Sequence, residues 1–366
     1  MIHDLWVEVD LNALRHNFLQ VRSAVGSDCR IMAVVKGNGF GHGMIEPAKT
    51  FVEAGANMLG VTRLAEALAL REAGLDCPIL MFAPIQKGNA QCAIDAELDM
   101  TVCDLELAEA ISQAAIAIGK TARLWIKVDT GMGRFGVLTK NAAALVDDIT
   151  NLPGISIAGI YTHFATSLEP NLSKTKEQLN EFDAVLKSLQ AAQIDYGMAS
   201  AANSAAILRL PESHFDIVRP GTLLYGQYPS SSVPHTLDLK PTWRLKARIC
   251  QIKDIPKGSS IGYGAEYRAE RDIRVAVLPV GYADGFTLSP EGQMYRHSVL
   301  KYAYNKARRR LCVKVKGYRA AVLGRVAMQT TVICVTGIGG VEVGDEVVIP
   351  ARRIPASALI PRIYSS

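Results

Sequence analysis

The chain has 366 residues, 49% of them hydrophobic and 20% charged, and its formal net charge is +5 at pH 7. This length exceeds the usual size of one domain, so we expect two globular domains with sizeable apolar cores. The seven cysteines form no CxxC pair, which argues against zinc and disulfide frameworks and favours a reducing cytoplasm. No signal-peptide pattern opens the chain, and no apolar stretch approaches the ~20 residues that span a bilayer, so we expect no membrane association.

Much of the positive charge lies in one segment, residues 301–316. A basic run of this kind is more often a solvated surface than a nucleic-acid site. Aromatic side chains, on which the bases of a single strand would stack, are limited in this region to Tyr295, Tyr302 and Tyr304. We therefore expect no nucleic-acid partner.

The chain begins with a strand-like run, LWVEVD, and a helical stretch follows it. From residue 30 to about residue 225, apolar strand-like runs alternate with amphipathic helical stretches. The predicted strands are residues 30–36, 58–63, 78–84, 99–104, 122–129, 155–164, 194–200 and 215–221. Eight strands in alternation with helices predict an α/β fold, a (β/α)8 barrel of the TIM type, and an open doubly wound sheet is the alternative.

The pattern changes after Pro234, where β-rich runs are separated by glycines and charged turns. This change predicts a barrel domain over residues 11–236 and an all-β C-terminal domain over residues 237–366. The strand within residues 1–10 is not needed to complete the eight strands of the barrel. We expect it to join the C-terminal domain.

Active-site residues of such barrels lie at the carboxyl ends of the strands, and the loops after strands seven and eight often bind phosphate. The polar residues and the glycine that fall at such positions are Lys36, Lys127, His163, Asn203, Ser204, Arg219 and Gly221. Gly221 would let backbone N–H groups approach a phosphate, and Ser204 could donate its hydroxyl. Arg219 on its own fits a structural ion pair equally well.

Lys36 lies between a buried apolar run, AVV, and a glycine-rich loop, GNGFGHG. Burial of an amine is costly and lowers its pKa, which suits imine chemistry with a carbonyl compound. A lysine that merely extends to the barrel rim is the structural alternative. The glycines favour the chemical interpretation, because they allow a ligand to approach the backbone closely.

The run GMGRFG at residues 131–136 matches the GxGxxG pattern of dinucleotide sites. It lies in the fifth strand–helix unit rather than the first, and the stretch VLTKN delays the helix that follows. We therefore do not interpret it as a nicotinamide site.

Eight motifs resemble, in their order along the chain, those of the alanine racemase family of pyridoxal-phosphate enzymes: AVVKGNGFGHG, KVDTGMGRFG, IYTHFATS, ANSAA, VRPGTLLYG, SIGYGAEY, GYADGF and PRIY. Together they span nearly the whole chain. The resemblance implies pyridoxal 5'-phosphate as the cofactor and the two-base racemisation of a small amino acid, alanine first. It also implies a homodimer whose two active sites each borrow residues from the partner subunit.

The resemblance further assigns roles to matched residues. Lys36 would hold the cofactor as a Schiff base and act as one acid/base group, and Tyr263 of the partner subunit would be the other. Arg219 would bond the pyridine nitrogen, with support from His163. The remaining cofactor-binding residues, chiefly at the phosphate, would be Asn203, Ser204, Gly221 and Tyr225.

The substrate would meet a second group of residues. Arg134 would lie near its carboxylate, Met328 would offer that carboxylate a backbone donor, and Tyr282 would line the way in. Lys127 would be carbamylated, a modification that the family often makes, which would place an anion near Arg134.

Three substitutions depart from the family pattern: Phe40 and Ala358 stand where tyrosine is usual, and Gln329 stands where aspartate is usual. A pocket opened by the loss of a tyrosine ring penalises bulk less, so a broader racemase acting on serine or larger side chains is one alternative. A non-catalytic pyridoxal-phosphate-binding protein is another, but it would lack the β domain and Tyr263. A barrel-type decarboxylase is a third, but it would pair the pyridine nitrogen with an acid instead of Arg219.

Overall fold

The computed structural model describes residues 2–288 and 311–366 of the chain. The chain folds as two compact units: Leu11–Thr242 forms one, and Trp243–Ser366 forms the other together with the N-terminal strand β1 (Leu5–Asp10). Most of the basic segment 301–316 lies outside the described residues. Over the described ranges, no helix is both long enough and apolar enough to cross a membrane.

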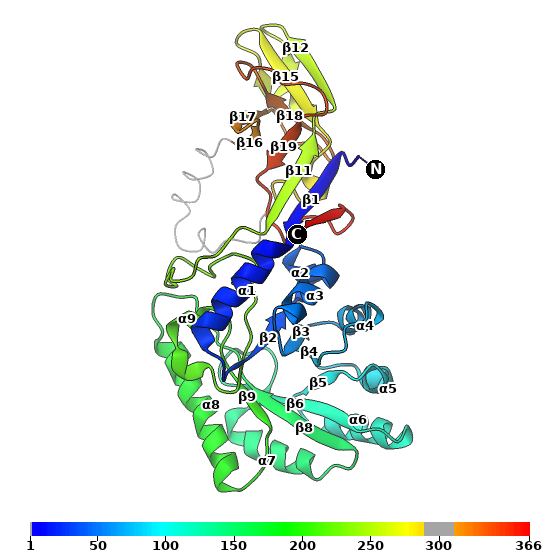
Figure 1. The fold of residues 1–366 in the computed structure, drawn as a ribbon, viewed down its shortest axis with the longest axis vertical. Coiled ribbons are helices and arrows are strands. Elements are labelled where there is room, and N and C mark those ends of the chain that lie inside the picture. The colour runs from blue at the N-terminus through cyan, green and yellow to red at the C-terminus, as the bar shows by residue number, and fades with distance from the viewer. Residues whose placement is uncertain (1, 289–310) are drawn as a thin grey trace. The chain divides into compact units, whose positions relative to one another are not determined.

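Parallel strands form a barrel in the first unit (Figure 1). They are β2 (Arg30–Val34), β3 (Met58–Val61), β4 (Ile79–Met81), β5 (Asp99–Val102), β6 (Ala122–Asp129), β8 (Ile155–Tyr161), β9 (Met198–Ser200) and β10 (Ile217–Val218). The sheet order β10-β2-β3-β4-β5-β6-β8-β9 leaves β9 and β10 at its two ends. These ends meet, because Asn203 and Arg219 form a parallel bridge and the N–H of Arg219 donates to the carbonyl of Ala202 at 2.9 Å. The predicted (β/α)8 barrel is confirmed, and the open-sheet alternative is wrong.

Helices cover the outside of this barrel (Figure 1). The main ones are α1 (Leu11–Val25), α3 (Ile45–Glu53), α4 (Leu64–Glu72), α5 (Ala90–Asp95), α6 (Leu105–Ala117), α7 (Thr139–Thr150), α8 (Ser173–Ala191) and α9 (Ser204–Arg209). In α8, the side chains of Leu179, Phe182, Leu186 and Leu189 are buried. Their spacing of three to four residues makes one apolar stripe along the helix, which burial against the barrel stabilises.

The barrel unit extends beyond residue 236, the end that the sequence predicted. Asn17 on α1 accepts a hydrogen bond from the N–H of Lys240 at 2.8 Å and donates to the carbonyl of Lys240 at 2.9 Å. The hydroxyl of Thr242 donates to the carbonyl of Tyr225 at 3.0 Å. These bonds hold residues 237–242 on the barrel.

The second unit is built on an antiparallel sheet. Its longer strands are β11 (Trp243–Arg248), β12 (Gln251–Ile255), β15 (Ile273–Leu278), β16 (Cys312–Val315), β17 (Tyr318–Leu323), β18 (Thr331–Cys334), β19 (Glu346–Ile349) and β20 (Arg362–Ser365). The N-terminal strand β1 lies between β11, with which it pairs antiparallel, and β20, with which it pairs parallel. The all-β character expected for the C-terminal part is confirmed.

Candidate active site

A cavity of about 310 Å³ lies among residues at or just beyond the carboxyl ends of the barrel strands. Eight of the residues singled out in the sequence line it: Lys36, Lys127, Arg134, His163, Asn203, Ser204, Arg219 and Gly221. Five of these eight side chains are basic, and the lining contains no aspartate or glutamate among the described residues. This excess of basic over acidic side chains favours an anionic ligand.

Lys36 stands at the start of a left-handed turn. Strand β2 ends at Val34, two residues earlier than the sequence predicted, and the backbone then turns through Gly37 and Gly39, whose φ angles are +65° and +60°. The carboxylate of Glu66 on α4 holds this turn by accepting the N–H of Gly37 at 2.7 Å. Burial lowers the pKa of the Lys36 amine, the Arg134 cation lowers it further, and Glu66 opposes the shift.

Arg219 is buried beneath the same cavity. Its guanidinium donates to the carbonyls of Thr162 at 2.6 Å and Ala201 at 3.1 Å, and to the hydroxyl of Ser200. Burial lowers the pKa of Arg219 to about 10, so the group remains a cation at neutral pH. In the part of the chain that the structure describes, Arg219 makes no hydrogen bond to the imidazole of His163.

His163 and Lys127 are two further bases in the cavity wall. Burial lowers the pKa of each well below its ordinary value, and the Arg219 cation reinforces both shifts. The amino group of Lys127 is buried and has no hydrogen-bond partner among the described residues. At neutral pH the imidazole of His163 is therefore expected to be uncharged, and the charged form of the Lys127 amine is disfavoured.

A second cluster of polar groups lies where the loops after β9 and β10 come together. The hydroxyl of Ser204 accepts the N–H of Gly221 at 2.8 Å, and the side chain of Asn203 accepts two N–H groups from the first turn of α9. A Cβ atom on Gly221 would lie 2.9 Å from the ring of Phe40, so any larger residue there would require that ring to shift. The hydroxyl of Thr222, also in the cavity wall, is buried without a partner among the described residues, and sequence reasoning missed it.

Tyr225 is placed differently from the other predicted cofactor residues. It is 1% exposed and is not part of the cavity lining. Its ring centre lies 4.8 Å from that of Phe40, which does line the cavity. Tyr225 therefore packs against Phe40 without lining the cavity itself.

Arg134 belongs to a loop that is wound around one carboxylate. Asp129, at the end of β6, accepts the N–H groups of Gly131, Met132 and Gly133 at 2.9 to 3.1 Å. At Gly136, a Cβ atom would lie 2.6 Å from the nitrogen of Asp129. The glycines of the GMGRFG run thus serve the tight winding of this loop, which explains why the run resembles a dinucleotide motif.

Three predicted site residues belong to the second unit, and all three side chains are exposed: Tyr263 by 72%, Tyr282 by 46% and Met328 by 58%. The N–H of Tyr282 donates to the carbonyl of Ala327 at 3.1 Å, and the carbonyl of Met328 accepts the N–H of Ala283 at 3.0 Å. Tyr282 and Met328 therefore lie close together. Tyr263 follows Gly262, which lies beside the backbone of Arg325 in the loop that leads to Met328.

Two family models match the chain. The model described as alanine racemase, N-terminal domain, matches residues 9–229, and the model described as alanine racemase, C-terminal domain, matches residues 242–361. The chain is 41% identical to an alanine racemase of Desulforamulus reducens, over 95% of this chain and 90% of that protein. It is 38% identical to an alanine racemase of Methanococcus maripaludis, over 95% of this chain and 89% of that protein.

Solved structures agree with these matches. An alanine racemase of Clostridium difficile 630 superimposes with a TM-score of 0.92 at 29% identity, covering 100% of this chain and 96% of the other. An alanine racemase of Bacillus anthracis with bound L-Ala-P superimposes with a TM-score of 0.86 at 30% identity, again covering 100% and 96% of the two chains.

Proposed function

The chain belongs to the alanine racemase family, and we propose that it interconverts L- and D-alanine with pyridoxal 5'-phosphate held by Lys36. One observation carries the proposal: the amine of Lys36 shares one cavity with Arg219 and with the Ser204–Gly221 cluster. These three partners correspond to three groups of the cofactor: Lys36 would meet its aldehyde, Arg219 its pyridine nitrogen, and the Ser204–Gly221 cluster its phosphate.

The residues present fit this cofactor. A cavity of about 310 Å³ is within the usual range of roughly 300–1,000 Å³ for small-ligand sites. The buried hydroxyl of Thr222 lacks a partner among the described residues, which is expected where a bound anion would complete the hydrogen bonds. Because burial lowers the pKa of Lys36, a larger fraction of its amine is uncharged and nucleophilic than for a lysine in water.

When bound, pyridoxal phosphate would supply the electron sink that stabilises negative charge at the substrate Cα. Arg219 would donate to the pyridine nitrogen. Because arginine does not readily give up its proton, that nitrogen would stay unprotonated and the sink would be weak. A weak sink disfavours decarboxylation and transamination, which compete with racemisation.

Racemisation requires a proton to leave one face of Cα and another to arrive on the opposite face. Lys36 would serve one face. Tyr263 of the partner subunit would serve the other, in a homodimer whose sites are shared. Arg134 would sit near the substrate carboxylate and near the phenol of the partner subunit's Tyr263.

The remaining predicted residues would shape the substrate side of the site. Met328 would offer a backbone N–H to the carboxylate, and Tyr282 would line the path of the substrate. Lys127 would carry a carbamate. The uncharged form of its amine, which burial favours, can attack carbon dioxide and lose a proton to solvent, and the Arg134 and Arg219 cations would stabilise the anion formed.

The alternatives considered from the sequence are not favoured. Family models cover both the barrel and the β unit, which argues against a single-barrel binding protein. The relatives from Desulforamulus reducens and Methanococcus maripaludis are named alanine racemases, and no observation on the cavity favours serine or a larger side chain.

Incubation of the purified, cofactor-loaded protein with a panel of L-amino acids tests the proposal, with chiral chromatography as the readout. We expect D-alanine to form fastest. Absence of any D-enantiomer, or faster conversion of serine, would overturn the proposed activity or the proposed substrate.

A further inference from the structure

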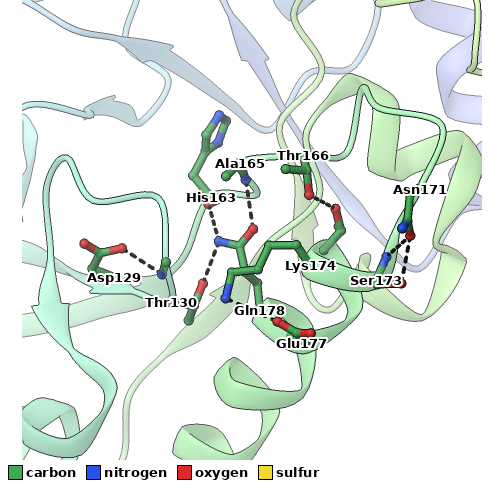
Figure 2. Close-up of polar contacts among 12 residues, drawn as sticks. Asp129, Thr130, His163, Ala165, Thr166, Asn171, Ser173, Lys174, Glu177 and Gln178 are labelled. Carbon is green, nitrogen blue, oxygen red and sulfur yellow. Dashed lines mark hydrogen bonds and ion pairs between the residues drawn. The ribbon is translucent and has the colours of Figure 1, made fainter.

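Gln178 is a fully buried polar side chain in the N-terminal part of a helix, outside the cavity lining. It lies on α8 and is 0% exposed. Figure 2 shows it between Thr130 on one side and His163 and Ala165 on the other. Its amide oxygen accepts the N–H of Ala165 at 2.9 Å, and its amide nitrogen donates to the hydroxyl of Thr130 and to the carbonyl of His163, both at 3.3 Å.

The hydroxyl bonds around Gln178 fit one consistent set of proton positions. Thr162 donates its hydroxyl to the carbonyl of Val128 at 3.1 Å. The hydroxyl of Thr130, 2.7 Å from that of Thr162, must then be the donor between the two, which leaves its own oxygen to accept from Gln178. A neutral amide is the side chain that meets this need, since it offers one acceptor and two donors without a buried charge.

These bonds join two loops that carry different parts of the proposed site. Thr130 begins the loop that leads to Arg134, and His163 lies in the loop after β8. The network continues to the cofactor side, because the carbonyl of Thr162 accepts the Arg219 guanidinium at 2.6 Å.

Resting on the function proposed above, we propose that Gln178 is a positioning residue for the reaction. It fixes the loop of Arg134, which meets the substrate carboxylate, relative to His163 and Arg219, which meet the cofactor. Gln178 touches neither substrate nor cofactor. Loss of the Gln178 amide should therefore weaken the binding of both substrate and cofactor, in addition to any effect on fold stability.

The test compares Gln178→Leu, which keeps the size of the side chain but none of its hydrogen bonds, with Leu186→Ala. Leu186 lies further along α8 and is 4% exposed, so its truncation destabilises the same helix without touching the loops. Each variant is measured for Tm, for the KM and kcat of alanine, and for the Kd of pyridoxal phosphate by absorbance titration of the cofactor-free protein.

We expect Gln178→Leu to raise the KM for alanine and the Kd of the cofactor by about tenfold, the loss that one or two hydrogen bonds produce. Leu186→Ala should lower Tm at least as much and leave both constants within about twofold of the wild type. Equal effects of the two variants on KM and Kd would overturn the proposal.

Thr130 provides a second test should Gln178→Leu fail to fold. Thr130→Val removes only the hydroxyl between Gln178 and Thr162, and Thr130→Ser restores it. We expect KM and Kd to rise in the valine variant and to return in the serine variant. Unchanged constants in Thr130→Val would also overturn the inference. A wild-type protein that binds the cofactor without racemising alanine would contradict the proposed function, and the Kd comparison would still decide the role of Gln178.

Discussion

The amino group of Lys127 lies 4.4 Å from the centre of the Tyr161 ring and makes no hydrogen bond to any other described residue. The phenol of Tyr161 is itself engaged, since its oxygen lies 2.8 Å from the hydroxyl of Thr101. Lys127 is therefore a buried amine beside an aromatic face. The Arg219 and Arg134 cations lower its pKa further, and Cys103 and the Asp129 carboxylate oppose that shift. This environment disfavours the charged form of the amine. The uncharged form is the one that can be chemically modified.

A first prediction follows for the pH dependence of stability. Burial holds the pKa of Lys127 in the folded chain below its ordinary value of 10.5. Between these two pKa values the unfolded chain takes up a proton that the folded chain does not, so the contribution of Lys127 to stability falls as the pH falls. Replacement by an apolar side chain removes this loss. In cofactor-free protein and CO2-free buffer, Lys127→Met should have a higher Tm than the wild type.

The gain in Tm should be larger near pH 7 than near pH 9.5, because the loss in the wild type grows as the pH falls below 10.5. Lys140→Met, a change at an exposed lysine on α7, is the matched control and should alter Tm little at either pH. A gain that does not depend on pH, or a less stable Lys127→Met protein, would contradict this account.

The second prediction concerns modification of the same amine. Protein exchanged into 13C-bicarbonate should show one labelled carbamate carbon per chain by NMR, and Lys127→Met should lack it. Racemase activity should fall in CO2-free buffer and recover when bicarbonate is returned, because the anion beside Arg134 would be lost and then restored. A carbamate signal of equal size in Lys127→Met would assign the modification to another residue.

The third prediction concerns the cofactor. Wild-type protein should be yellow, and borohydride should fix a pyridoxyl group on the peptide that contains Lys36. Lys127 also lines the cavity, so peptide mapping must separate the two lysines. Lys36→Ala should lose the covalent adduct, and its racemase activity should fall by about 10²–10⁴-fold, the usual contribution of an acid/base group. An adduct mapped to Lys127 would contradict the assignment of Lys36.

Much of the fold could be predicted because a parallel strand buried on both faces reads as an apolar run. All eight predicted barrel strands have a counterpart in the structure, although several are shorter. The predicted end of β2 is wrong because the apolar run AVV continues as far as Val35, directly before Lys36, whereas the turn through Gly37 and Gly39 ends the strand at Val34. The apolar pattern of a strand does not indicate where such a turn begins, and the glycines are its only signal in the sequence.

Only some residues of the candidate site could be predicted from the sequence. Residues at strand ends, such as Lys36 and Arg219, could be grouped because the barrel brings those ends together. Gln178 could not be found, since a glutamine in KEQLNEF reads as part of a solvated helix face and only the hydrogen bonds of the folded chain reveal its burial. Tyr263 lies in the other unit, so its proposed role came from resemblance to the family and not from spacing.

We propose that each site uses Lys36 of one subunit and Tyr263 of the partner subunit. Lys36→Ala and Tyr263→Phe should each lower racemase activity by about 10²–10⁴-fold. The most direct test is to dissociate the two inactive proteins, mix them in equal amounts and let dimers re-form. One of the two sites in each hybrid dimer would then contain both wild-type residues, so activity should return to roughly one quarter of the wild-type value. If both groups instead acted within one chain, every site would lack one of them, and a mixture as inactive as its parents would contradict the account.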